Sequence, residues 1–453
     1  MFTEKAARRL VDAAVKYARK ETNASGIEVS IWIVESATAR FANNEMTQHL
    51  QSLKGYIAVR ALVGGRSAVA TGDKYTVAGV RKLVDDAVAE AAGLKHDART
   101  YHLLKPDNPF VALPEGLKER FDPRVARITA EDRYQAVEKI VQIARKHDLT
   151  AAGVYWPTTS FYAIGNSNGL FRCSYDSTIE CSVTMVSETS TGWQKASSWT
   201  LDNVNVERVA KIAAEKALNT RRPKAVEPGA WDVVLEPSAV LDLFMFLIGS
   251  FTGDSHVEET SVFYNKAGKQ VLGENITISD DVYHQLQTGR YFDDEGMTRK
   301  AVNLVVNGVF KQPTKSRRAA AYLGGSPTGH GCGLPASEYD YPLNLVIKGG
   351  NTSLKKMIAS TERGILLPRV WYLRDVDPNT CSVTGMTRDG AMLIEKGQLK
   401  GGIKNMRFNV SLIDLFKNVT MMGRSILAAG EEGFPAVVPS MKVKDFMFTS
   451  RTK

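Results

Sequence analysis

The stretch Ile27-Glu28-Val29-Ser30-Ile31-Trp32-Ile33 places apolar side chains at alternate positions, which is typical of a β-strand. Before this stretch, apolar side chains recur at helical spacing after Thr3, a residue type that caps helices. A helix followed by a strand is therefore predicted at the start of the chain. Short strands are also predicted at residues 38–43, 56–63 and 67–70, with a Gly64-Gly65 hairpin turn and a covering helix at residues 77–92.

The rest of the first half continues this mixture of helices and strands. Residues 93–128 contain four prolines, and a loop of this length is either a functional arm or a wrapping connection, which the sequence leaves open. Thr129-Ala130-Glu131-Asp132 resembles a capping box before an amphipathic helix at residues 134–146. Strands are predicted at residues 153–164, 170–175 and 179–187, and a closing helix at residues 206–218.

The character of the chain changes after residues 221–229, whose Pro, Gly and charge content is that of an interdomain linker. We predict an N-terminal α+β domain at residues 1–222, with mixed or antiparallel sheets flanked by helices. Residues 223–453 are predicted to form a β-rich C-terminal domain of short strands separated by Gly and Asp turns. This domain is interrupted by a very apolar helix at residues 238–248 and another near residues 354–362. The predicted fold class is α+β with two domains.

The composition, 43% hydrophobic and 24% charged, is that of an ordinary soluble globular protein. The longest apolar run, residues 241–248, is too short to cross a bilayer, and the first ten residues lack an apolar leader, so we expect a cytoplasmic protein without membrane association. The net charge is +9, but Lys and Arg are interleaved with Asp and Glu. The dense basic stretches 221–224 and 311–318 do not by themselves define a nucleic-acid surface.

The cysteines are scattered along the sequence without any C-x-x-C spacing. This pattern argues against a disulfide scaffold and against a structural zinc knuckle. Reduced thiols are therefore expected at Cys173, Cys181, Cys332 and Cys381.

Gly165-Asn166-Ser167-Asn168-Gly169 matches the G-x-S-x-G pattern of a nucleophile elbow. An elbow requires a strand that enters the turn and a helix that leaves it, whereas here one predicted strand follows another. No histidine is near in sequence. The pattern therefore favours a hairpin turn over a catalytic serine.

Residues 324–333 contain five glycines, which allow the backbone to approach a ligand closely and present bare amides. The lysine of a phosphate-binding loop is absent, so nucleotide binding is not indicated. His330 and Cys332 would need further metal ligands from elsewhere, and a structural loop beside a binding groove is the favoured interpretation. The candidate groove residues are Gly324, Gly325, Thr328, Gly329 and His330.

Other polar clusters favour structural roles. His256 and Glu259 have the spacing of di-metal helices, but their neighbours do not look helical, so a surface ion pair is predicted. Asp280-Asp281 and Asp293-Asp294-Glu295-Gly296 are predicted to be acidic turns rather than calcium sites. No histidine is followed by Glu, so neither H-E-x-x-H nor H-E-x-x-x-H occurs, and no metal site is predicted. The histidines are His49, His96, His102, His147, His256, His284 and His330.

Several motifs taken together resemble the TldD/PmbA (TldE) family. The resemblance spans nearly the whole chain, and its C-terminal motifs are specific in combination. In the first half it includes residues 27–29, 55–59 and 165–169. In the second half the order is Thr260-Ser261-Val262-Phe263, residues 291–296, 306–310, 326–331, 394–397 and 434–443.

The catalytic TldD branch of that family carries H-E-x-x-x-H on the helix before the T-S-V-F stretch and a late cysteine before a G-x-E-G turn. Alignment on Thr260 places Phe244, Met245 and Gly249 where the two histidines and the glutamate would be. Alignment on residues 430–433 places Ala429 at the cysteine position. The resemblance therefore implies a TldE/PmbA-like chain without the zinc motif, which should not hold the metal.

The resemblance further implies a cytoplasmic heterodimer in which a TldD-like catalytic subunit holds zinc and this chain completes a narrow groove for unfolded or modified peptides. On this interpretation the chain has no cofactor or catalytic residue of its own and is inactive alone. Two alternatives remain open: a self-sufficient peptidase or hydrolase with another site, and a regulator associated with DNA gyrase. The sequence also leaves open the natural peptide substrate and whether the chain pairs with itself.

Overall fold

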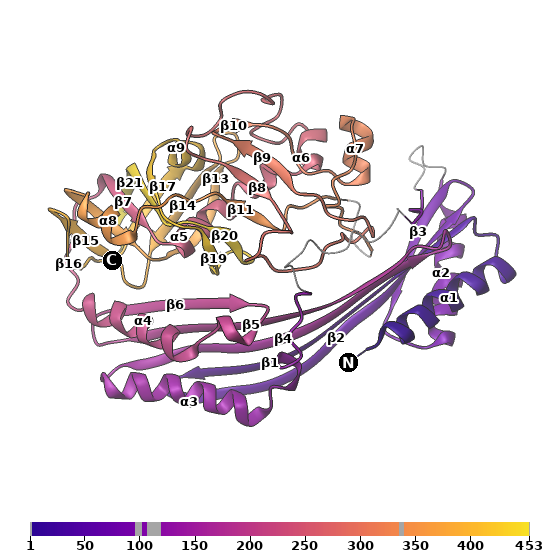
Figure 1. Ribbon diagram of the computed structural model, residues 1–453, viewed down its shortest axis with the longest axis horizontal. Helices are drawn as coiled ribbons and strands as arrows, with labels where there is room; N and C mark the ends of the chain where they lie inside the picture. The colour runs from indigo at the N-terminus through magenta and orange to yellow at the C-terminus, as the bar shows by residue number, and fades with distance from the viewer. Residues whose placement is uncertain (1, 96–101, 107–118, 335–338, 453) are drawn as a thin grey trace.

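The computed structural model of the protein describes residues 2–95, 102–106, 119–334 and 339–452. The first half of the chain forms a long antiparallel sheet, with strands in the order β3-β2-β1-β4-β5-β6. Helices cover one face of this sheet, and the second half of the chain lies over the other face (Figure 1). The strands are β1 (Gly26–Ala42), β2 (Glu45–Val63), β3 (Arg66–Gly72), β4 (Thr150–Asn166), β5 (Phe171–Val186) and β6 (Thr191–Ser198).

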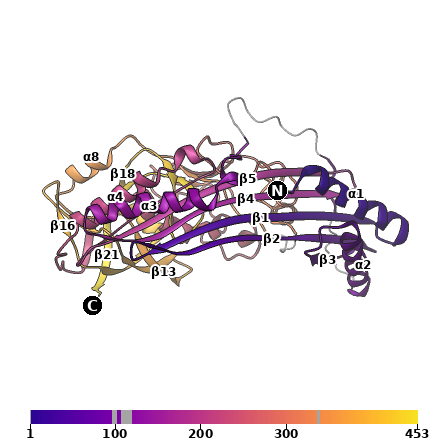
Figure 2. The ribbon, with the colours of Figure 1, turned by 90° about the horizontal axis from the view of Figure 1, so that it is seen from below.

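The helices of the first half cover the two ends of the same sheet face (Figure 2). α1 (Glu4–Glu21) and α2 (Val77–Gly93) bury their apolar sides against one end of β1 and β2. α3 (Ala130–Lys146) and α4 (Val206–Asn219) bury their apolar sides at the other end of the sheet, where α4 packs on β5 and β6. These helices confirm the predictions from apolar periodicity, because a helix with one apolar side needs a sheet face to cover it.

The strands are much longer than predicted. β1 and β2 contain 17 and 19 residues, whereas the sequence indicated only short extended runs. The middle of β2 is polar and exposed, so it carries no alternating signal, and pairing with β1 along its whole length makes it a strand. β5 is likewise one continuous strand where two were predicted.

Both faces of the sheet are buried where β1 begins. Val29 and Ile31 point to the helices and have no exposed surface. Glu28 and Ser30 on the other face are equally buried, because the second half of the chain packs there. At this end Tyr162 donates to the Asp294 carbonyl (3.0 Å) and Tyr56 to the Leu334 carbonyl (3.1 Å).

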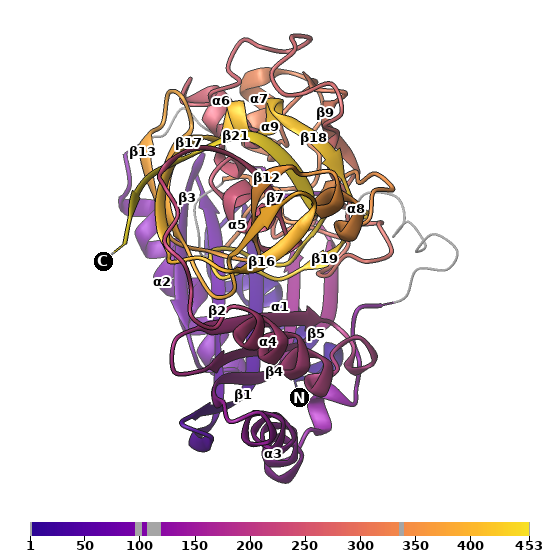
Figure 3. The ribbon, with the colours of Figure 1, turned by 90° about the vertical axis from the view of Figure 1, so that its left-hand side faces the viewer.

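The second half forms two further sheets around one apolar core, and their curvature is visible end-on in Figure 3. One sheet has the order β10-β9-β8-β11-β20-β19, with β8 (Ile278–Asp280), β9 (Val302–Val306), β10 (Val309–Phe310), β11 (Leu345–Ile347), β19 (Ile426–Ala428) and β20 (Ala436–Val438). The other has the order β13-β14-β17-β21-β7-β12-β15-β16, and β18 pairs with β21. Its strands are β7 (Gly229–Leu235), β12 (Arg363–Leu367), β13 (Val370–Asp377), β14 (Ser382–Thr387), β15 (Met392–Glu395), β16 (Gln398–Gly402), β17 (Met406–Ser411), β18 (Val419–Met422) and β21 (Met441–Arg451).

Short helices lie among these strands. They are α5 (Pro237–Met245), α6 (Gly253–Val257), α7 (Arg317–Leu323), α8 (Leu354–Ala359) and α9 (Leu412–Lys417). The fold is therefore α+β with a β-rich second half, as predicted. Among the helices of the described ranges, none combines the length and the apolar character that a bilayer crossing requires.

The proline-containing segment 93–128 is described in part, and residues 96–101 and 107–118, with His96, Pro109 and Pro114, lie outside the described residues. Near its end, Arg120 is buried and donates hydrogen bonds to backbone carbonyls of the second half, among them those of Val282 and Gly289. This end of the segment therefore ties the two halves together.

Candidate functional site

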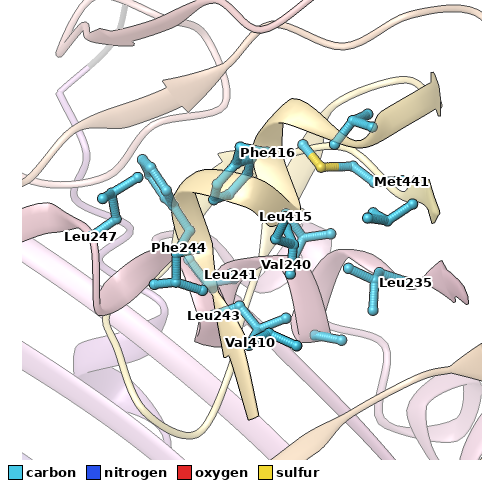
Figure 4. Packing of buried hydrophobic residues seen from close by; sticks show 14 of the residues in the cluster. Leu235, Val240, Leu241, Leu243, Phe244, Leu247, Val410, Leu415, Phe416 and Met441 are labelled. Carbon is cyan, nitrogen blue, oxygen red and sulfur yellow. The ribbon is translucent and has the colours of Figure 1, made fainter. Parts of the chain in front are cut away.

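Helix α5 carries two of the positions at which the catalytic branch would have ligands. Pro237 at the first turn starts the helix without losing a hydrogen bond. Phe244 near its end has no exposed surface and lies against Phe416, with ring centroids 5.8 Å apart (Figure 4). Its ring also lies 6.2 Å from that of Phe251. This position is therefore part of the apolar core.

Helix α5 ends at Met245, three residues before the end predicted from the apolar run. Gly249 lies beyond it, in a separate 3₁₀ turn at Ile248–Phe251. Gly249 is exposed, and no atom lies within 4 Å of the place where a Cβ would stand. The three positions thus do not share one regular helix, so the spacing of an H-E-x-x-x-H ligand set is not preserved.

The late loop at residues 429–433 packs directly on α5. Ala429 is buried, and its carbonyl accepts a hydrogen bond from Ser238 Oγ (2.9 Å). A Cβ on Gly433 would lie 2.2 Å from Met245 Cγ, so only glycine permits this approach. The structure therefore brings Met245 and the loop after Ala429 together, while Phe244 belongs to the core and Gly249 to another turn.

Asp242 connects helix and loop, and sequence reasoning missed it. Its carboxylate has no exposed surface and accepts hydrogen bonds from the backbone N–H groups of Glu431 (2.9 Å) and Glu432 (3.0 Å). Burial raises the pKa of Asp242 to about 7, although these hydrogen bonds and the charge of Arg369 act in the opposite direction. Its Oδ2 has no hydrogen-bond partner among the described residues. A single acid within an otherwise apolar helix was the available signal.

At the contact between α5 and the 429–433 loop, which we call the α5 junction, the positions aligned with the metal ligands of the catalytic branch carry no zinc-donor set. A phenyl ring, a thioether, a hydrogen and a methyl group occupy positions 244, 245, 249 and 429. Zinc prefers thiolate, imidazole and carboxylate ligands, so these side chains do not fit it. In the part of the chain that the structure describes, no three His, Cys, Asp or Glu side chains come together in a way that could hold a metal ion.

The glycine-rich segment is exposed at one end and buried at the other. Gly324 and Gly325 are exposed and have positive φ angles of 77° and 84°. Thr328 and Gly329 are buried, and the Thr328 hydroxyl accepts from the Lys315 N–H (2.7 Å). His330 is buried between Thr328 Oγ1 (2.9 Å) and Asp280 Oδ1 (2.9 Å). Its imidazole therefore supports the loop from inside.

Three aromatic residues, Tyr339, Tyr341 and Phe434, connect this segment to the α5 junction, and we call them the aromatic stripe. The Tyr341 N–H donates to the His330 carbonyl (3.0 Å), which holds the stripe against the glycine segment. Tyr339 and Tyr341 are 50% and 37% exposed, and the Tyr341 ring meets Phe434 edge-on at 6.1 Å. Phe434 follows Gly433, which contacts Met245. The stripe thus runs from the glycine segment to Met245, one of the positions aligned with the metal ligands of the catalytic branch.

The predicted acidic turn at residues 293–296 is confirmed. Asp293 accepts from the N–H groups of Glu295 (3.1 Å) and Met297 (2.8 Å), which closes the turn. It also accepts from the Gly331 N–H (2.8 Å), so the turn supports the glycine segment. Burial first, and then the neighbouring Glu295 charge, raise the pKa of Asp293 to about 7.

The prediction of a surface ion pair between His256 and Glu259 is wrong. His256 lies in helix α6, is buried, and stacks on Phe310 with ring centroids 5.3 Å apart. Glu259 instead accepts a hydrogen bond from the Tyr264 hydroxyl (2.7 Å). The short helix escaped prediction because a single turn has no apolar periodicity to detect.

The hairpin prediction for the G-x-S-x-G pattern is confirmed. Asn166 Oδ1 accepts from the N–H groups of Asn168 (3.0 Å) and Leu170 (3.3 Å) and closes the turn between β4 and β5. Ser167 Oγ accepts from the Ile27 N–H (3.1 Å), so it holds the start of β1. The cysteines at 173, 181, 332 and 381 are free thiols, as expected.

Comparisons with known proteins match the domains of one family along most of the chain. Models of the PmbA/TldA metallopeptidase family match as domain 1 at residues 28–91, the central domain at 123–221 and the C-terminal domain at 228–450. The chain is 23% identical to a metalloprotease TldD homolog of Haemophilus influenzae, covering 86% of this chain and 85% of that protein. It is 21% identical to metalloprotease PmbA of Escherichia coli, covering 68% of each. A 28% identical metalloprotease of Methanocaldococcus jannaschii is matched over only 48% of its length.

Two solved structures have the same fold over their full length. TldE from Thermococcus kodakarensis superimposes with a TM-score of 0.86 at 19% identity, covering 98% of this chain and 99% of that one. A putative modulator of DNA gyrase from Thermotoga maritima gives 0.83 at 18% identity, covering 98% and 100%.

We predict that Phe244→Ala lowers the free energy of unfolding by about 3–5 kcal/mol, because it removes a fully buried ring and leaves a cavity. Denaturant unfolding measures this change. Leu399→Ala, at a position 40% exposed on β16, is the control and should change stability little. Equal effects of the two substitutions would show that position 244 is not part of a packed core.

We predict that Asp242→Asn changes the pH dependence of stability. The pKa of Asp242 in the folded chain, about 7, lies above the ordinary value of 3.8, so the wild type loses stability as pH rises through this interval. Asparagine cannot ionise, so the stability of the variant relative to wild type should rise by on the order of 1–3 kcal/mol between about pH 5 and pH 8. Urea unfolding across this range measures it, and a difference independent of pH would contradict the prediction.

Proposed function

The chain belongs to the PmbA/TldD metallopeptidase family, and we propose that it is the metal-free, TldE-like subunit of a two-subunit zinc peptidase. The zinc and the catalytic residues would belong to a TldD-like partner subunit. This chain would complete the groove through which unfolded or modified peptides reach the metal. This chain itself would bind no cofactor.

This proposal rests on the side chains that occupy the α5 junction. The helix and the late loop are in contact, as a ligand helix and a ligand loop would be, but Phe244 fills the core and Ala429 offers only a methyl group. Of the four aligned positions, only Met245 has a potential donor atom, and one thioether does not make a zinc site. The junction therefore retains the packing of the fold without the chemistry of the catalytic branch.

The groove residues proposed from the sequence divide into two roles. Gly324 and Gly325 are exposed and could meet a peptide backbone. Thr328, Gly329 and His330 are buried and would act by fixing the loop. The aromatic stripe beside them offers amphipathic rings, which bury apolar peptide side chains at low cost in conformational entropy. We infer that a peptide substrate lies along this stripe toward the partner's metal.

The proposal is tested by assembling the two subunits from purified components. This chain, a TldD-like subunit and their mixture are each assayed for zinc content and for cleavage of an unfolded peptide. We expect zinc only with the TldD-like subunit and full peptidase activity only in the mixture. Cleavage by this chain alone in the presence of chelator would indicate a self-sufficient hydrolase. Salt-sensitive binding to duplex DNA, with no gain of activity in the mixture, would favour the gyrase-associated alternative.

The same assay tests the role of the stripe. Tyr341→Ala should raise KM for peptide in the mixture several-fold and leave subunit association unchanged, because one aromatic contact is worth on the order of 1 kcal/mol. Tyr134→Ala, on α3 and 47% exposed, is the matched control and should behave as wild type. Equal kinetics for both variants would contradict a peptide path along the stripe.

A further inference from the structure

The middle of the helix face of the long sheet holds an open cavity. α1 and α2 cover one end of this face and α3 and α4 the other, and these helices leave the strands between them bare (Figure 2). The cavity has a volume of about 1020 Å³, which is the size of a small-molecule site, and we call it the sheet trough. The second half of the chain packs on the opposite face of the sheet (Figure 1). The sheet therefore separates the trough from the α5 junction.

The floor of the sheet trough is formed by side chains that share the helix face. Ile33 and Glu35 are successive residues of β1 on this face, and their partners on β4 are Phe161 and Thr159. Leu53 of β2 lies opposite Glu35 and is 72% exposed. The floor is therefore mostly apolar, with the Glu35 carboxylate between Leu53 and Thr159.

Two aromatic rings form the wall of the trough at the end that α1 and α2 cover. Phe2 precedes α1 and Tyr75 precedes α2, and their ring centroids lie 5.6 Å apart. Phe2 also lies 5.6 Å from the Phe161 ring of the floor. A Cβ on Gly55 would lie 2.4 Å from the Tyr75 hydroxyl oxygen, so the glycine makes room for this ring beside β2. This end of the trough can therefore hold an apolar body.

The charges that face the trough are negative. Gln51 Nε2 donates to Glu35 Oε1 (3.3 Å), and within the described ranges no Lys, Arg or His side chain forms an ion pair with Glu35. Asp73 lies at the rim, and burial first and then the Asp73 charge raise the pKa of the Tyr75 hydroxyl. Of the described residues that line the trough, Lys54 alone is cationic, and the alternation of β2 places its side chain on the opposite face. A carboxylate without a cationic partner, close to aromatic rings, favours an organic cation.

We propose that the sheet trough binds a small organic cation, with its ammonium group on the Glu35 carboxylate and its apolar body against Phe2 and Tyr75. Ile33 and Glu35 lie about 7 Å apart along β1, so a short spacer between the ammonium group and the apolar body matches the site. An anion of the same shape would meet the Glu35 charge, and a neutral hydrocarbon would leave the carboxylate without a partner. The inference goes beyond the proposed peptidase role and does not rest on it.

The probe for the test is 2-phenylethylammonium, added to the purified chain at neutral pH and followed by saturation-transfer NMR over a concentration series. Phenylacetate has the same ring and the opposite charge, and ethylammonium has the charge without the ring, so these two are the matched control ligands. We expect 2-phenylethylammonium to bind with a dissociation constant on the order of 1 mM, and both control ligands to bind at least about tenfold more weakly.

Substitutions in the floor test which groups hold the probe. Glu35→Gln removes the charge with little change of shape and should raise the dissociation constant about tenfold, because a charge-assisted hydrogen bond is lost. Leu53→Ala shortens an exposed side chain of the floor and should raise it several-fold with little effect on stability. Glu45→Gln, at an exposed position of β2 outside the trough, is the matched control and should bind as wild type. Circular dichroism confirms that each variant is folded.

Failure of 2-phenylethylammonium to bind the wild-type chain, or equally strong binding of phenylacetate, would overturn the proposal. So would an affinity that Glu35→Gln leaves unchanged, because the carboxylate would then not be the partner of the ammonium group. Glu35→Gln should leave the peptidase activity of the mixed subunits unchanged. The ligand titration and the peptidase assay therefore fail or succeed separately.

Discussion

The contact on which the candidate site depends is the buried carboxylate of Asp242 held by two backbone N–H groups of the 429–433 loop. It joins a helix and a loop that are almost 200 residues apart in the sequence. Because the carboxylate is fully buried, losing these hydrogen bonds would lower the stability of the folded chain. The contact therefore fixes the loop in one position. Gly433 then meets Met245 and Phe434 meets Tyr341, so the stripe and the junction follow from this contact.

The sequence predicted the fold where one local signal was sufficient. Thr129 and Asp132 form the predicted capping box, and the helices with a single apolar side lie where their periodicity placed them. The long strands could not be predicted in full, because residues 45–56 are mostly polar and become a strand only through pairing with β1. The register shift in β2 at Thr47 is likewise a property of paired strands.

The candidate site was predictable only in part. Resemblance indicated positions 244, 245, 249 and 429, and the structure places them around one helix and one loop, apart from Gly249 in the next turn. Sequence did not show that Phe244 joins the core of the second half, or that Asp242 ties the junction together. Nor did it show that His330 points inward to Asp280, because a histidine in a glycine-rich segment looks exposed until its neighbours are known.

At the α5 junction, Phe244 packs into the apolar core at a position where the catalytic branch would have a metal ligand. The most direct measurement is a calorimetric titration of the isolated, chelator-treated chain with zinc at neutral pH. We expect no stoichiometric binding and no change in the unfolding temperature on addition of zinc. Binding of one zinc ion per chain with high affinity, lost on substitution of Met245 or Asp242, would contradict it.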